Sequence, residues 1–101
     1  MQNLINTTVI VRSSPSGCWA GKLQSVDGST VTLTNARRLW RWWAAEGVSL
    51  SGVAATGLDP EHLDECRIAA PVETAVIFEV CEILSATERA VVSIYAAPVS
   101  R

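Results

Sequence analysis

Residues 35–45 contain most of the side chains in this sequence that could bind a planar anion. The segment reads NARRLWRWWAA and holds three of the four tryptophans of the 101-residue chain, together with three arginines. An aromatic base stacks on an indole or guanidinium plane, and a guanidinium donates paired hydrogen bonds to phosphate. The segment therefore predicts a binding surface for a ligand that is both aromatic and negatively charged, such as a nucleotide.

Two local structures could present this surface, and the sequence leaves both open. In a strand that continues from Val31 and Leu33, one face carries Arg38, Trp40 and Trp42 with the threonines, and the inward face carries Arg37, Leu39, Arg41 and Trp43. In a helix that starts after Asn35, one side carries Arg37, Trp40 and Arg41. Either structure places an indole beside guanidinium groups.

The candidate ligand-binding residues are Trp19, Arg37, Arg38, Trp40, Arg41 and Trp42, with Arg12 and Lys22 as further phosphate contacts. Trp19 follows the SSPSG segment and could close the pocket from another loop or another subunit. The competing interpretation is that the tryptophans, Trp43 first among them, are core or interface residues whose neighbouring arginines pair with acids. The two interpretations differ in what a tryptophan substitution damages, which is binding in one case and stability in the other.

The charge distribution places any anion site in the first half of the chain. Residues 1–45 hold five basic residues against one aspartate, a net charge of +4, and residues 46–101 hold three arginines against nine acids, a net charge of −6. The total of −2 conceals this separation. Because proteins that bind long polyanions usually show a broad basic face, the single basic cluster favours a small anion over nucleic acid.

Few residues offer catalytic or metal chemistry. His62 is the only histidine, no glycine-rich phosphate loop is present, and the spacing of His62 and Cys66 supplies too few ligands for a metal site. Asp64 and Glu65 are typical of the solvated face of a helix. We therefore expect no enzyme activity, no metal and no cofactor.

Size and composition predict one domain, residues 1–101, that self-associates. Hydrophobic residues make up 49% of the chain and charged residues 18%, and a domain this small builds only a thin core. Apolar surface should therefore remain for a second subunit, and we expect a homo-oligomer. Cys18, Cys66 and Cys81 are widely spaced, which predicts buried or half-buried thiols without a disulfide.

Strands dominate the first half of the predicted structure. Residues 7–13 are rich in β-branched side chains, the turn residues of SPSG follow, and Asp27-Gly28 joins residues 18–26 to residues 29–35 in a tight hairpin. Gly21 predicts a bend or bulge in the first arm of that hairpin. Residues 46–58 are compatible with a short strand or an irregular loop.

Helices enter in the second half, beside further strands. Asp59 and Pro60 predict an N-cap and first helical position for a short helix over residues 61–66, and residues 67–84 are strand-rich. Ser85 and Glu88 predict a capping box for a C-terminal helix that ends at Pro98. The fold class is α+β, a small curved antiparallel β-sheet or partly closed barrel with a short helix and a C-terminal helix.

The segment GKLQSVDGSTVTLTNARRLWRWWAA resembles a family of small proteins encoded by tailed bacteriophages, in which G-K-L, D-G, V-x-L and N-A-R-R-L-W recur. The resemblance extends to the E-x-L-x-x-T-E-R stretch that contains Glu82 and Arg89. It implies a phage accessory protein, and such proteins include anti-CBASS sponges that sequester the nucleotide messengers of host defence. Residues 21–35 are also similar, more weakly, to the strand pair of Sm-like RNA-binding folds.

These observations predict a non-enzymatic, oligomeric protein that sequesters a nucleotide, with a cyclic oligonucleotide as the ligand that the phage resemblance implies. The alternatives are an Sm-like RNA-binding module and a structural or inhibitory module that binds a protein partner through its tryptophans. The N-terminus lacks the pattern of a secretory signal, and no apolar run approaches the ~20 residues that cross a bilayer. We expect a location in the cytoplasm of the host cell and no membrane partner.

Overall fold

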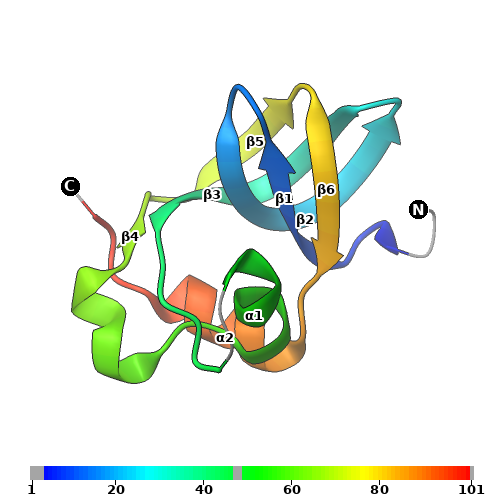
Figure 1. The fold of residues 1–101 in the computed structure, drawn as a ribbon. Coiled ribbons are helices and arrows are strands. Elements are labelled where there is room, and N and C mark those ends of the chain that lie inside the picture. The colour runs from blue at the N-terminus through cyan, green and yellow to red at the C-terminus, as the bar shows by residue number, and fades with distance from the viewer. Residues whose placement is uncertain (1–3, 47–48, 101) are drawn as a thin grey trace.

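Two antiparallel hairpins build the centre of the sheet in the computed structural model, which describes residues 4–46 and 49–100. The elements in chain order are β1 (Thr8–Ser13), β2 (Gly17–Asp27), β3 (Thr30–Arg41), α1 (Ser49–Thr56), the 3-10 helix η2 (Pro60–Glu65), β4 (Arg67–Ile68), β5 (Val72–Ile77), β6 (Val80–Ser85) and α2 (Glu88–Ala96). The order across the sheet is β4-β3-β2-β1-β6, and β5 pairs with β3 beside β4. The predicted α+β class is confirmed, and the antiparallel sheet is curved and not closed (Figure 1).

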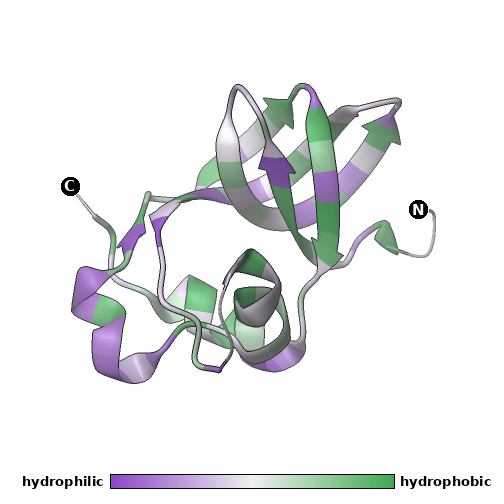
Figure 2. Cartoon of the chain, viewed as in Figure 1, coloured by the Kyte–Doolittle hydropathy of each residue, from purple (hydrophilic) through white to green (hydrophobic). Residues whose placement is uncertain are grey.

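Both helices and η2 lie together on one side of the sheet (Figure 1). The strand β1 is consequently buried on both faces, and Val9, Ile10 and Val11 are fully buried. Ile10 packs into a core between the sheet and the helices, whereas Val9 and Val11 pack into a second core inside the curve of the sheet. Figure 2 shows the corresponding hydrophobic bands along the strands and on the helices.

The predicted hairpin between β2 and β3 forms, but its turn lies one residue later than expected. Its central residues are Gly28 and Ser29 instead of Asp27 and Gly28, and Gly28 takes a φ of +61°. Glycine at the first central position, with a positive φ, is typical of a type II′ turn. The register also shifts at Gly21, but the extra residue of this bulge lies in β3, where Asn35 and Ala36 together oppose Gly21, and not in the first arm as predicted.

The segment 46–58 forms neither of the two structures predicted for it. It contains the helix α1, whose Leu50, Val53 and Ala54 are buried at i, i+3 and i+4. No acidic residue lies in its first turn and no basic residue in its last, and serine and glycine are poor helix formers. The burial of one face therefore stabilises α1, because local propensity does not.

The two other helices are confirmed, with one wrong cap. Asp59 accepts a hydrogen bond from the backbone N–H of Glu61 at 3.0 Å and begins η2 as predicted. Thr87, not Ser85, is the N-cap of α2, and its hydroxyl accepts from the N–H of Ala90 at 3.2 Å. Ser85 is instead the last residue of β6, where it pairs with Val9 of β1.

A buried arginine joins the sheet to the end of α2. The side chain of Arg37 on β3 is 2% exposed. Its guanidinium donates to the carbonyls of Ala69 at 2.8 Å, Ile94 at 2.7 Å and Ala97 at 2.9 Å. The carbonyls of Ile94 and Ala97 belong to the C-terminal turn of α2, where a positive charge is favourable. Burial lowers the pKa of this guanidinium from its ordinary value.

Replacement of Arg37 should destabilise the protein strongly. Arg37→Ala leaves buried carbonyls without donors and opens a cavity, so we expect a loss of about 3–5 kcal/mol in the free energy of unfolding. Arg37→Lys should lose less, because an ammonium retains the charge but lacks the planar fork. Urea unfolding measures both losses, and the exposed Arg41→Ala should stay within about 0.5 kcal/mol of the wild type. Equal stability of the Arg37→Ala and Arg41→Ala variants would contradict this role.

Candidate functional site

Two indoles and one guanidinium form a stack at the start of β2 and the end of β3. Strand pairing places Arg38 of β3 directly opposite Trp19 of β2, and Trp40 follows two residues later on the same strand. The guanidinium carbon of Arg38 lies 3.9 Å from the centre of the Trp40 ring and 5.7 Å from that of Trp19. Both distances are within the range of cation–π attraction. We call Trp19, Arg38 and Trp40 the indole–arginine stack.

The turn before β2 supports this stack from one side. Gly17 has a φ of +80°, and a Cβ at this position would lie 3.4 Å from the Nη2 atom of Arg38. Glycine therefore permits both the left-handed backbone and the close approach of the guanidinium. The indole N–H of Trp19 donates to the carbonyl of Ser16 at 3.1 Å, which fixes this ring against the same turn.

The outer part of the stack is open to solvent. Trp40 is 61% exposed, and Trp19 and Arg38 are half-buried. No carboxylate in the part of the chain that the structure describes forms an ion pair with Arg38. The stack therefore offers an exposed aromatic face next to a positive charge that no described acidic side chain neutralises.

Two more arginines lie at the outer end of β3. Arg41 pairs across the sheet with Arg67 of β4, and both side chains are exposed. The Nη1 atom of Arg67 donates to the backbone carbonyls of Asp64 at 2.8 Å and Cys66 at 3.1 Å. Like charges at directly opposed positions are unfavourable, and a bound anion would offset their repulsion. We call Arg41 and Arg67 the arginine pair.

A second aromatic stack joins the loop after β3 to η2. The rings of Trp43 and His62 lie 4.7 Å apart at an interplanar angle of 18°, and Trp43 is 42% exposed. The Nδ1 atom of His62 lies 2.7 Å from a carboxylate oxygen of Asp59, and its Nε2 lies 3.8 Å from Glu65. The hydrogen bond to Asp59 raises the pKa of His62, and the Glu61 N–H and His62 lower the pKa of Asp59.

The structure brings together only part of the predicted site. Trp19, Arg38 and Trp40 form the indole–arginine stack, and Arg41 is exposed beyond it. Arg37 is buried with its donors bonded to carbonyls, and we assign it to the fold instead. Trp42 packs half-buried against the core beneath the helices.

The neighbouring residues also differ from their predicted positions. Trp43, which the strand interpretation and the competing core interpretation both directed inward, is 42% exposed, and the imidazole of His62 stacks on it. This contact joins residues nineteen positions apart, and no local pattern in the sequence indicates it. Arg12 pairs with Glu82 at 3.6 Å, and Lys22 is exposed on β2 away from the stack.

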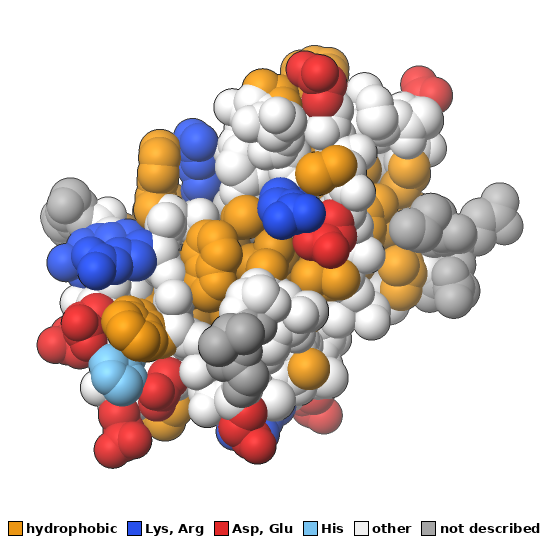
Figure 3. All heavy atoms as spheres, viewed as in Figure 1, with side chains coloured by type: hydrophobic (Ala, Val, Ile, Leu, Met, Phe, Trp, Pro, Cys, Tyr) orange, Lys and Arg blue, Asp and Glu red, His pale blue; other side chains and the backbone are white. Residues whose placement is uncertain are grey.

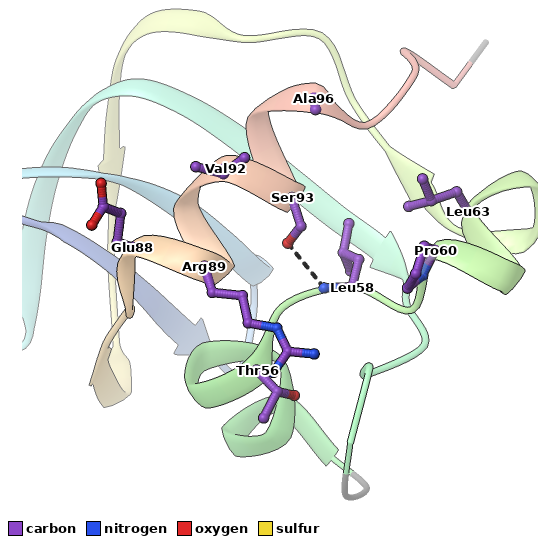
Figure 4. Close-up of a pocket in the computed structure, with 9 residues that line it drawn as sticks. All are labelled: Thr56, Leu58, Pro60, Leu63, Glu88, Arg89, Val92, Ser93 and Ala96. Carbon is purple, nitrogen blue, oxygen red and sulfur yellow. Dashed lines mark hydrogen bonds between the residues drawn. The ribbon is translucent and has the colours of Figure 1, made fainter.

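A hollow of the described surface lies elsewhere, between α2 and the chain that runs from α1 to η2 (Figure 4). It has a volume of about 650 Å³, and Leu58, Leu63 and Val92 are among its apolar lining residues. The Ser93 hydroxyl accepts from the Leu58 N–H at 3.0 Å, and the Arg89 guanidinium pairs with Glu46 at 3.2 Å. Its one lining arginine is thus already neutralised, which makes the groove a poor match for an anion.

The described residues contain no cluster of three or more His, Cys, Asp or Glu side chains that could hold a metal ion. Burial raises the pKa of the Cys18 and Cys66 thiols, so both stay protonated near neutral pH. Cys81 is exposed, unlike the buried or half-buried position predicted for it. None of the helices within the described ranges is long and apolar enough to cross a membrane.

A family model described as a domain of unknown function (DUF6948) matches residues 6–94. The chain belongs to this family. The match includes every residue of the indole–arginine stack, the arginine pair and the second aromatic stack. No curated protein and no solved structure matches the chain.

The single histidine allows a direct test of the second aromatic stack. Because the raised pKa favours the charged imidazole in the folded state, His62 stabilises the fold below its ordinary pKa of 6.5. This contribution is lost as the pH rises through the raised value. We expect the imidazole resonances in NMR spectra to titrate with a midpoint above 6.5. Asp59→Asn should lower the midpoint more than Glu65→Gln does, and an unchanged midpoint in Asp59→Asn would exclude the hydrogen bond as its cause.

Proposed function

We propose that the protein binds a nucleotide at the indole–arginine stack and does not alter it chemically. The observation that carries the proposal is the contact of Arg38 with Trp40 at 3.9 Å, on a ring that is 61% exposed. Exposed tryptophan is unfavourable in water, and a base that stacks on the free face of the ring would cover it. The ligand would thus add an aromatic layer to a stack that already exists.

The charge at the stack supports a phosphorylated ligand. Two indole contacts orient the Arg38 guanidinium before any ligand arrives, and its N–H groups lie at the edge of the plane. Phosphate oxygens accept paired, charge-assisted hydrogen bonds from such an edge. Because no described carboxylate pairs with Arg38, a phosphate would not have to displace one. Because Arg38 is already oriented in the free protein, its side chain loses less conformational freedom when a ligand binds, which favours binding further.

The phage resemblance of NARRLW and the neighbouring motifs supports a more specific form of this proposal. In that form the protein sequesters a nucleotide messenger of host anti-phage defence, with a cyclic oligonucleotide as the expected ligand, in the host cytoplasm. A sponge needs tight binding and no turnover. A cyclic dinucleotide incubated with the protein should therefore be recovered intact after denaturation, and a hydrolysed product would assign the protein to an enzyme class.

RNA binding through an Sm-like module is a weaker candidate. The net charge of the chain is −2, and the described acids Asp59, Asp64 and Glu65 lie on and around η2, close to the arginine pair. Binding to a long polyanion requires many phosphate contacts on a continuous basic surface. A short ligand contacts only a few arginines, so its binding does not depend on a continuous basic surface.

Two variants test nucleotide binding by isothermal calorimetry with adenosine monophosphate. Trp40→Ala removes a stacking surface worth about 1–3 kcal/mol per base, so its affinity should fall by roughly 5- to 150-fold. Arg38→Ala removes charge-assisted hydrogen bonds worth about 1.5–3 kcal/mol, and its deficit should shrink more in added salt than that of Trp40→Ala. Arg12→Ala, which removes an arginine paired with Glu82, is the matched control and should bind normally.

Thermal melts of the same variants separate binding from folding. Since Trp40 is mostly exposed, Trp40→Ala should retain the stability of the wild type to within about 1 kcal/mol. Arg38→Lys keeps the charge without the plane and should bind more weakly than wild type while it remains folded. Normal nucleotide affinity in all three stack variants would exclude this surface as the site. Its exposed indole would then favour the remaining candidate, a module that binds a protein partner.

We also infer that the chain forms a homo-oligomer through β5. Val72, Val76 and Phe78 at β5 and its end are 42%, 51% and 58% exposed. Within the described ranges β5 pairs only with β3, so its other edge offers backbone groups that a strand of a second copy could pair. The apolar side chains and the free edge lie on the same element, which favours a second copy as the partner.

Sedimentation at micromolar concentration tests this assembly. The wild type should sediment well above the monomer mass of 10.8 kDa. Val76→Lys, a charge on the exposed face of β5, should shift the population toward monomer, whereas Val92→Lys on α2 should not. A monomeric wild type would exclude the assembly.

A further inference from the structure

The second aromatic stack lies next along the chain from the indole–arginine stack. Trp40 ends the first stack and Trp43 begins the second, three residues later. Three residues of chain span at most about 10 Å, which bounds the distance between the Cα atoms of the two tryptophans. Both rings are well exposed, at 61% for Trp40 and 42% for Trp43. The chain therefore carries two exposed indoles on backbone positions that one dinucleotide is long enough to span.

One member of the arginine pair lies between the two tryptophans along the chain. Arg41 occupies the chain position after Trp40, and its cross-strand neighbour Arg67 directly follows η2 and Cys66. Figure 3 shows a cluster of basic side chains on one face, with an apolar side chain and acidic side chains below it and the imidazole of His62 below these. Neither Arg41 nor Arg67 forms an ion pair with a described acidic side chain. A bound anion would offset the repulsion between two arginines at opposed strand positions that have no acidic partner.

We propose that Trp43 and His62 form a second base-stacking position and that Arg41 and Arg67 hold the phosphate that links it to the first. The ligand class is then an oligonucleotide of at least two bases joined by a phosphodiester, which stacks one base at Trp40 and another at Trp43. This inference rests on the proposed nucleotide function, and it assigns the second base and the linking phosphate of the ligand to named residues.

The acidic side chains around His62 define the orientation of such a ligand. Asp59 and Glu65 contact the imidazole, and Asp64 is exposed on the same 3-10 helix. Carboxylates repel phosphate, but they accept hydrogen bonds from the amino groups of bases. The phosphodiester should therefore lie toward Arg41 and Arg67, and the edge of the second base toward η2.

Calorimetry with adenosine monophosphate and the linear dinucleotide pApA tests the second position. The wild type should bind pApA roughly 5- to 100-fold more tightly than the mononucleotide, since each stacked base contributes separately. Trp43→Ala should remove most of this advantage and leave the mononucleotide affinity unchanged. Trp40→Ala should instead weaken both ligands. Arg41→Ala should weaken pApA alone, and the deficit should decrease in added salt.

A second readout separates contact at the site from a structural effect of the substitution. His62 is the only histidine, so its imidazole resonances are unambiguous in NMR spectra. Saturating pApA should shift them, whereas the mononucleotide should not. Trp43→Phe keeps an aromatic ring and should retain a large part of the pApA advantage, which guards against the case in which Trp43→Ala unfolds.

The possible outcomes distinguish this inference from the function on which it rests. If the mononucleotide binds at the indole–arginine stack, and pApA binds no more tightly and leaves the His62 resonances unmoved, the second position is excluded and the nucleotide function stands. If neither ligand binds the folded wild type, both proposals are overturned. If pApA binds with an advantage that Trp43→Ala does not reduce, the second base lies elsewhere and the assignment to Trp43 and His62 is wrong.

Discussion

The buried guanidinium of Arg37 determines how the sheet and α2 fit together, and the position of the candidate site depends on it. A charge that is 2% exposed is tolerated only when its donors are satisfied, and here the carbonyls of Ala69, Ile94 and Ala97 satisfy them. These carbonyls come from the chain after β4 and from the end of α2. Because successive side chains of a strand point to opposite faces, burial of Arg37 beneath the helices directs Arg38 to the other face, opposite Trp19.

A bulge in β3 determines which arginine is buried. The register moves from Thr34 opposite Lys22 to Arg37 opposite Ala20, so Asn35 and Ala36 together oppose Gly21. Asn35 has a φ of +49°, and the Tyr95 hydroxyl of α2 donates to its carbonyl at 2.6 Å. A side chain at Gly21 would lie only 3.0 Å from Leu33 and 3.2 Å from Ala36. Without the extra residue Arg37 would share the face of Leu33, and Arg38 would point toward α2.

This bulge explains why the sequence predicted the fold better than the site. The turn residues correctly predicted both hairpins, and Asp59 and Pro60 correctly predicted the start of η2. These predictions rest on local sequence preferences, which packing did not override. Simple alternation in β3 placed Arg38 with the threonines, whereas it lies on the face of Leu33 and Ala36. The only indication of this bulge in the sequence was Gly21, which lies on the partner strand β2. The helix α1 and the stacking of His62 on Trp43 depend on tertiary contacts, which no short window of sequence reveals.

The separation of charge along the chain persists in the folded protein, and this is the strongest physical argument for a ligand. The fold brings acidic η2 beside the end of β3, since Asp59 donates its backbone N–H to the Trp43 carbonyl at 2.7 Å. The carboxylate of Asp59 bonds to His62 and Arg67 bonds to backbone carbonyls, so none of these contacts is an ion pair between η2 and the arginine pair. If the arginines served only solubility, pairing them with the adjacent acids would cost little. Arg38, which stacks on the exposed ring of Trp40 and forms no ion pair with a described acid, keeps its donors available to an anion from solution, and this supports the proposed nucleotide site.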